Sequence, residues 1–139
     1  MPPRFELFDH TADVGVRVFA PSLPELIAPA TAGLYVVIGE FASGGPPAPR
    51  RFELTGDEPA MLLRDYLAEL LNLFDTERLY VTGVEAAEFT QQRLTVTARV
   101  QSVNMHESVF EREVKAVTYH ELAIRQTAAG YEATYIVDI

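Results

Sequence analysis

Carboxylate groups near the two ends of the chain are the residues best suited to bind a cation. Asp13 opens an alternating apolar segment, and Asp138 precedes Ile139, whose terminal main-chain carboxylate would lie one residue away. Hard divalent cations such as Ca²⁺, Mg²⁺ and Mn²⁺ bind carboxylate and carbonyl oxygens. These three residues would hold one metal ion if the first and last strands lie side by side. In the alternative interpretation, Asp13 caps a turn and Asp138 is a solvated residue.

Lys115 is the second candidate, because it is the only lysine beside ten arginines. It lies in the segment 114–120, whose other residues are typical of a buried strand. Lysine carries a compact point charge, whereas arginine carries a rigid planar fork. One interpretation is a strand residue whose amine reaches solvent. The other is a functional cation, which would also offset the repulsion among neighbouring carboxylates.

Four further polar residues are candidates for surrounding the metal ligands or Lys115, namely His10, Asp65, Glu69 and His120. Each has an ordinary alternative. The histidines would make structural hydrogen bonds, and the two acidic residues belong to a stripe that is typical of a solvated helix face. The sequence has no HExxH pattern for zinc and no GxSxG pattern for serine hydrolysis. It has no cysteine, which excludes thiolate chemistry.

Composition limits the class of partner. A chain of 139 residues with 48% apolar residues predicts one globular domain over residues 1–139. The net charge of −9 argues against strong independent binding of nucleic acid, because that binding requires basic side chains on phosphates. A cation or a basic protein surface is the better match. No apolar run is long enough to span a membrane. The absence of a signal-peptide core near Met1 favours a cytoplasmic location.

The apolar periodicity predicts an α+β domain, in which two amphipathic helices cover one face of a mostly antiparallel sheet. We expect the first helix to open with a capping box formed by Ser22 and Glu25 and to kink at Pro29. The second is expected to be capped by Asp57 and to continue to Phe74. Alternation with a period of two predicts strands at 5–8, 13–19, 50–54, 79–86, 93–101, 110–119, 122–126 and 131–137.

Several motifs, in their order and spacing, resemble the archease family over nearly the whole chain. They are His-Thr-Ala-Asp-Val-Gly at 10–15, Ser-Leu-Pro-Glu-Leu at 22–26, Leu-Leu-Arg-Asp-Tyr-Leu-Ala-Glu-Leu-Leu at 62–71, Val-Lys-Ala-Val-Thr-Tyr-His at 114–120 and Asp-Ile at 138–139. The resemblance implies a divalent-metal site at Asp13, Asp138 and Ile139, and it places the functional lysine of the family at Lys115. The chain departs from the family pattern at Pro29 and in the loop before the lysine.

Archeases are small acidic proteins that activate the GTP-dependent RNA ligase of the RtcB type in tRNA splicing and RNA repair. The resemblance therefore implies a protein cofactor and not an enzyme. This cofactor would promote guanylylation and multiple turnover of the ligase through Asp13, Lys115 and Asp138. Two other functions stay open: a chaperone-like or modulating binding protein, and a metal-dependent phosphoesterase that uses the same carboxylates.

Overall fold

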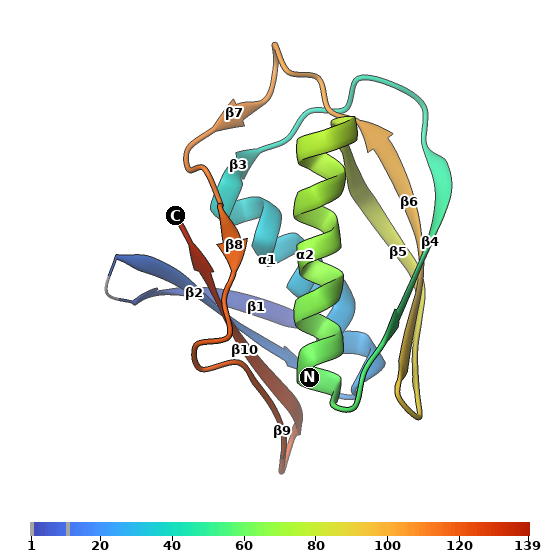
Figure 1. Ribbon diagram of the computed structural model, residues 1–139, viewed down its shortest axis with the longest axis vertical. Helices are drawn as coiled ribbons and strands as arrows, with labels where there is room; N and C mark the ends of the chain where they lie inside the picture. Colours follow the sequence, from blue (N-terminus) through green and yellow to red (C-terminus); the bar gives the residue numbers. More distant parts are fainter. Residues whose placement is uncertain (1, 11) are drawn as a thin grey trace.

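The fold combines antiparallel sheets with two longer helices in a computed structural model that describes residues 2–10 and 12–139 (Figure 1). The elements are β1 (Arg4–His10), β2 (Asp13–Ala20), the 3-10 helix η1 (Pro24–Leu26), α1 (Ile27–Ile38), β3 (Gly39–Glu40), β4 (Ala48–Thr55), α2 (Pro59–Glu77), β5 (Leu79–Thr90), β6 (Arg93–Ser102), β7 (Val109–Phe110), β8 (Ala116–Val117), β9 (Ala123–Thr127) and β10 (Gly130–Asp138).

The strands are divided among three antiparallel sheets. The largest has the order β1-β2-β10-β8, with β9 also paired to β10; the second is β4-β6-β5, and the third is the short pair β3-β7. Helix α1 contacts β1 and β2 and also β3 and β5, and α2 contacts β4, β5 and β6 as well as β8 and β9 (Figure 1). The predicted α+β class is therefore confirmed, and α2 connects the two larger sheets.

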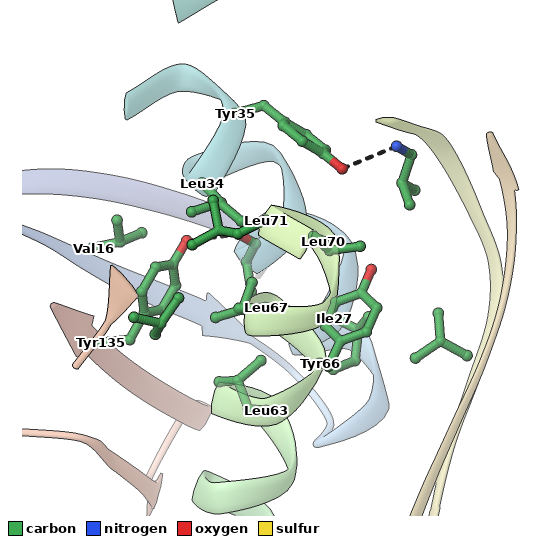
Figure 2. Close-up of a cluster of buried hydrophobic side chains, with 14 of the residues drawn as sticks. Val16, Ile27, Leu34, Tyr35, Leu63, Tyr66, Leu67, Leu70, Leu71 and Tyr135 are labelled. Carbon is green, nitrogen blue, oxygen red and sulfur yellow. Dashed lines mark hydrogen bonds between the residues drawn. The ribbon is translucent and has the colours of Figure 1, made fainter. Parts of the chain in front are cut away.

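The core lies between these helices and the inner faces of the sheets. One face of α2 is apolar at helical spacing, and its side chains pack toward α1 and β10 (Figure 2). Polar atoms inside this core are paired. The hydroxyl of Tyr135 donates to the carbonyl of Ala30 at 2.7 Å, and Tyr66 shares a 2.7 Å hydrogen bond with Thr31. The core thereby fixes the position of β10 against α1.

The first helix begins later than predicted. Ser22 donates a hydrogen bond to the Glu25 carboxylate at 2.6 Å and makes no side-chain cap to the backbone, so the expected capping box is wrong. The chain first makes a 3-10 turn, and α1 starts at Ile27. Pro29 is then the third residue of α1, within the first turn, where a missing backbone N–H is tolerated. The change from 3-10 to α geometry lies between Leu26 and Ile27, before Pro29, where we expected a kink.

The second helix is also capped differently. Its N-cap residue is Glu58, without a side-chain hydrogen bond, and Pro59 occupies the first turn. Asp57 instead accepts a hydrogen bond from the Gln92 amide at 3.2 Å, which joins the start of α2 to the turn between β5 and β6. The predicted Asp57 cap is therefore wrong, because a tertiary partner binds that carboxylate. The helix continues past Phe74 to Glu77.

The strand predicted at 110–119 is the largest error in the secondary structure. Only the end of β7 and the whole of β8 lie within it, in two different sheets, and residues 111–115 between them belong to no strand. The backbone N–H groups of Glu111 and Arg112 donate to the carbonyl of Ile38, at the end of α1, at 2.7 and 3.1 Å. This segment therefore serves as a cap on α1 rather than as a strand. Among the described residues, no helix is long and apolar enough to cross a membrane.

Candidate functional site

The first and last long strands of the largest sheet bring Asp13 and Asp138 together. Strands β2 and β10 are antiparallel neighbours, and these two residues are direct partners in their register. Directly opposed Cα atoms in an antiparallel pair lie about 4.5–5.5 Å apart, with both side chains on one face of the sheet. The spatial meeting that the sequence-based hypothesis required is therefore present.

Alternation of side chains explains why both carboxylates lie on the outer face. Val14 and Val16 of β2, and Tyr135 and Val137 of β10, are buried in the core. Successive residues of a strand point to opposite faces. The residues between and beyond these core positions, Asp13 included, must therefore point away from the helices, as Asp138 does in β10. Asp13 is half-buried and Asp138 is exposed.

The segment that carries Lys115 lies on the other side of β10. Ala116 is the register partner of Asp138, and the backbone N–H of Lys115 donates to the Asp138 carbonyl at 2.8 Å. The N–H of Thr118 donates to the carbonyl of Ile136 at 2.8 Å. In the register set by the Thr118 bond, the Asp138 carbonyl would accept from the N–H of Ala116. It accepts from Lys115 instead, one residue earlier, which is the pattern of a β-bulge. Lys115 is exposed beside the Asp13–Asp138 pair.

Arg64 is a neighbour that the sequence analysis missed. From α2, its Nε donates to the carbonyl of Val117 at 3.1 Å, and its guanidinium lies 4.4 Å from the ring centroid of Tyr119. It also forms a 2.9 Å ion pair with Asp65. Helix α2 therefore holds the segment that follows Lys115. The only signal in the sequence was an arginine at the border of the apolar face, which is common and would not have singled it out.

The other candidate residues have fewer contacts with Asp13, Asp138 and Lys115. His10 is the register partner of Asp13 in β1, but its side chain lies outside the described residues. Asp65 is engaged by Arg64, and Glu69 is an exposed residue of α2. His120 is exposed, and its backbone N–H donates to the Thr118 hydroxyl at 3.1 Å. The structure thus places the backbone of His10 opposite Asp13, whereas among the described residues no hydrogen bond or ion pair joins Glu69 to Asp13, Asp138 or Lys115.

The opposed carboxylates of Asp13 and Asp138 favour positive charge beside them. Like charges placed directly opposite each other on neighbouring strands repel, and a divalent ion is the simplest group to offset that repulsion. Within the residues that the structure describes, no set of three or more Asp, Glu or His side chains is arranged around a common point. A further ligand would have to come from the main chain, and the oxygens of Ile139 follow Asp138 directly. Carboxylate and main-chain oxygens are the donors that hard divalent ions take.

Residues 5–139 match the model of the Archease protein family (MTH1598/TM1083). Protein archease of Saccharolobus solfataricus is 33% identical over 138 residues, which cover 98% of this chain and 99% of that protein. Protein archease of Methanosarcina barkeri is 29% identical over 140 residues, 98% and 96% of the two chains.

Solved structures agree with this match. The solution structure of Protein 1598 of Methanobacterium thermoautotrophicum has a TM-score of 0.74 at 30% identity and covers 97% of this chain and 98% of its own. The crystal structure of an archease from Thermotoga maritima, described as a possible chaperone, has a TM-score of 0.66 and covers 96% of each chain. At 19% identity, that second likeness concerns the fold alone.

Proposed function

The chain belongs to the archease family, and from this membership we propose that it is a metal-binding protein cofactor of a GTP-dependent RNA ligase of the RtcB type. It would promote guanylylation and multiple turnover of that ligase in tRNA splicing and RNA repair. The observation that carries the proposal is the register of β2 and β10, which sets Asp13 opposite Asp138. The lysine segment lies along the same end of β10.

The proposed metal ligands are the carboxylates of Asp13 and Asp138 and a main-chain oxygen of Ile139. The donors are all oxygens, which fits Ca²⁺, Mg²⁺ or Mn²⁺ and not a soft metal. When bound, the ion supplies positive charge that can offset anionic phosphate oxygens. The residues themselves hold the ion at an exposed end of the sheet, where a partner surface can reach it.

Lys115 contributes a second positive charge in this proposal. Its backbone is bound to Asp138, so its exposed side chain starts beside the proposed metal ligands. An ammonium group acts on phosphate as a point charge and needs no defined planar geometry. Lys115 would therefore stabilise negative charge on the nucleotide or on its leaving group while the ligase performs the chemistry.

The charge of the whole chain supports an accessory role. With a net charge of −9, the protein is poorly suited to hold RNA by itself. In the proposed arrangement the ligase holds the RNA, and this protein contacts the ligase. It is accordingly proposed as an activator and not as an enzyme.

The activation test uses the cognate ligase, GTP and a guanylylation assay. We expect Asp13→Asn, Asp138→Asn and Lys115→Met each to lower the activated rate by about 10-fold or more. The aspartate changes weaken the proposed metal site, and the lysine change removes a positive charge placed for the nucleotide phosphates. Glu88→Gln is the matched control, since Glu88 is an exposed carboxylate on β5. Full activation by all three site variants would contradict the proposal.

A metal titration tests the site without the ligase. A ligand that binds only the folded state raises its stability by RT ln(1 + [L]/Kd). Millimolar Ca²⁺, Mg²⁺ or Mn²⁺ should therefore raise the melting temperature of the wild type and of Glu88→Gln, but not that of Asp13→Asn. Hydrolysis of phosphate esters by the protein alone would instead favour a phosphoesterase.

A further inference from the structure

A groove between the C-terminal end of α2 and the chain that connects β6 to β8 has no role in the site described above. It has a volume of about 450 Å³. Its apolar lining is Ile38, Leu71, Phe74, Met105, Phe110 and Val114. In Figure 1 this connecting chain passes around the end of α2 and beside β3 before it reaches β8. Met105 and Phe110 are 44% and 38% exposed, and the neighbouring Val109 is 54% exposed.

The walls of the groove are held in place before any partner arrives. The N–H of Val103 donates to the carbonyl of Arg78 at 2.8 Å, and the N–H of Asn104 donates to that of Ala42 at 2.7 Å. At the other end, Glu111 and Arg112 are bound to the carbonyl of Ile38. A surface that is already ordered loses little conformational entropy on binding, which favours affinity.

The basic and acidic side chains around the groove differ in whether they have partners within the protein. Its two arginines are exposed but already have partners within the protein. Arg112 donates to the carbonyl of Val37 at 3.1 Å, and the guanidinium of Arg78 lies 5.1 Å from the centroid of the Phe74 ring. The groove also has three carboxylates, those of Asp75, Glu111 and Glu113. Among the described residues, none of these three takes part in an ion pair.

We propose that this groove is a docking site for a protein segment that carries apolar side chains flanked by lysine or arginine. The exposed apolar lining requires an apolar partner, and the three carboxylates on a chain of net charge −9 require a basic one. A nucleic acid, an anionic membrane and a second copy of this chain are all negatively charged and would be repelled.

The position of the groove makes the proposed ligase the natural source of this segment, and in that respect the inference rests on the proposed function. Val114 lines the groove, and the next residue is Lys115. A partner seated on the groove would therefore contact the chain one residue before Lys115, whose backbone N–H is bound to the Asp138 carbonyl. Docking at the groove would supply affinity, whereas the carboxylates and the lysine would supply activation.

The test separates these two contributions with charge-reversal variants. Glu111→Lys/Glu113→Lys should raise the dissociation constant for the cognate ligase by about 10-fold or more. The dissociation constant of this variant should also depend less on salt. At saturating concentration this variant should still activate the ligase. Asp138→Asn should change the dissociation constant less than the groove variant does, while it lowers the activated rate at saturation by about 10-fold or more. Glu58→Lys/Glu88→Lys, at two exposed carboxylates outside the groove, is the matched control and should bind normally.

A second probe keeps the inference testable if the ligase is not the partner. The chain has three methionines, so spectra of protein labelled at the methionine methyl carbon are simple. An amphipathic peptide of leucine and lysine should shift the Met105 signal and leave that of Met61, at the start of α2, unchanged. A peptide in which glutamate replaces lysine should have no effect.

Each outcome decides one of the two proposals. Wild-type protein that neither binds nor activates the ligase contradicts the proposed function, while the peptide result still decides the groove. The groove inference is overturned if the Glu111→Lys/Glu113→Lys protein binds ligase as tightly as the wild type, or if the basic peptide leaves Met105 unshifted. It is also overturned if the wild type forms a dimer that this variant abolishes, because the occupant would then be a second copy.

Discussion

Gly15 is the residue that lets an aromatic ring cover the outer face of the sheet beside the candidate site. Its register partner is Phe8, and a Cβ at position 15 would lie 2.1 Å from the Phe8 ring. The guanidinium of Arg17 lies 4.5 Å from the centroid of the same ring. Ring, glycine and guanidinium therefore form one packed group on the face that also carries Asp13.

Gly15→Ala should lower the free energy of unfolding by about 1–3 kcal/mol, because the Phe8 ring must leave its position. Denaturant unfolding measures the change. Gly83→Ala is the control, since a Cβ there meets no atom within 4 Å. In a Phe8→Ala background the cost of Gly15→Ala should largely vanish; an undiminished cost would mean that the ring is not the cause.

Single residues also show the limit of reading chemistry from sequence. Asp13, Asp138 and Lys115 stood out by residue type and by their strand positions, and the structure places them at one end of β10. Arg64 did not stand out, because its partners are a carbonyl and a ring from a segment more than fifty residues later in the chain. Contacts of that kind depend on tertiary packing alone.

At the scale of elements, β8 is held from two sides. Strand β10 pairs with it at Val117 and Ala116, and α2 reaches it through the Arg64 contact with the Val117 carbonyl. A strand of two residues has little stability of its own. The position of Lys115 therefore depends on an arginine from a different layer of the fold.

Replacing Arg64 by methionine should loosen the lysine segment while the rest of the fold persists. The change removes the ion pair with Asp65 within α2, and it removes the hydrogen bond and the cation–π contact to the lysine segment. The last two together are worth about 1–2 kcal/mol. Hydrogen exchange at the amides of Lys115 and Thr118 should become faster by about 5- to 30-fold. Arg51→Met, at a side chain that is 64% exposed, is the control. Unchanged protection at both amides would show that β10 alone holds β8.

At the scale of the whole molecule, three buried phenols in the core make the stability of the fold depend on pH. Burial raises the pKa of Tyr35, Tyr66 and Tyr135 above the ordinary value of 10.0. A raised pKa means that the folded state favours the neutral phenol, whereas the unfolded chain ionises near pH 10. The stability linked to these groups is complete below about pH 10 and is lost as the pH rises toward their folded-state values.

Above about pH 10 the free energy of unfolding should therefore fall steeply. Each buried phenol contributes about 1.4 kcal/mol per pH unit, which gives about 4 kcal/mol per unit for all three. Denaturant unfolding between pH 8 and pH 11 measures this slope. Tyr135→Phe should reduce it by about a third, although it leaves the Ala30 carbonyl without its hydroxyl partner. Stability that stays constant to pH 11 would contradict this account.

The sequence by itself determined those features that follow from local periodicity and residue type. The alternation of valines around Asp13 and of apolar residues before Asp138 placed both carboxylates on a face opposite the core. The helical spacing of leucines in α2 predicted which of its faces is buried. These patterns are local, so the face they predict to be buried does not depend on how the strands are connected.

Only the tertiary structure decided the contacts between distant segments. The pairing of β2 with β10 turned two isolated carboxylates into an opposed pair. The segment 111–115 left the predicted strand because its N–H groups meet the open carbonyl of Ile38 at the end of α1. Asp57 likewise took Gln92 as a partner in place of a helix end. In each case a hydrogen-bonding group found a better partner far away in sequence, which no local pattern encodes.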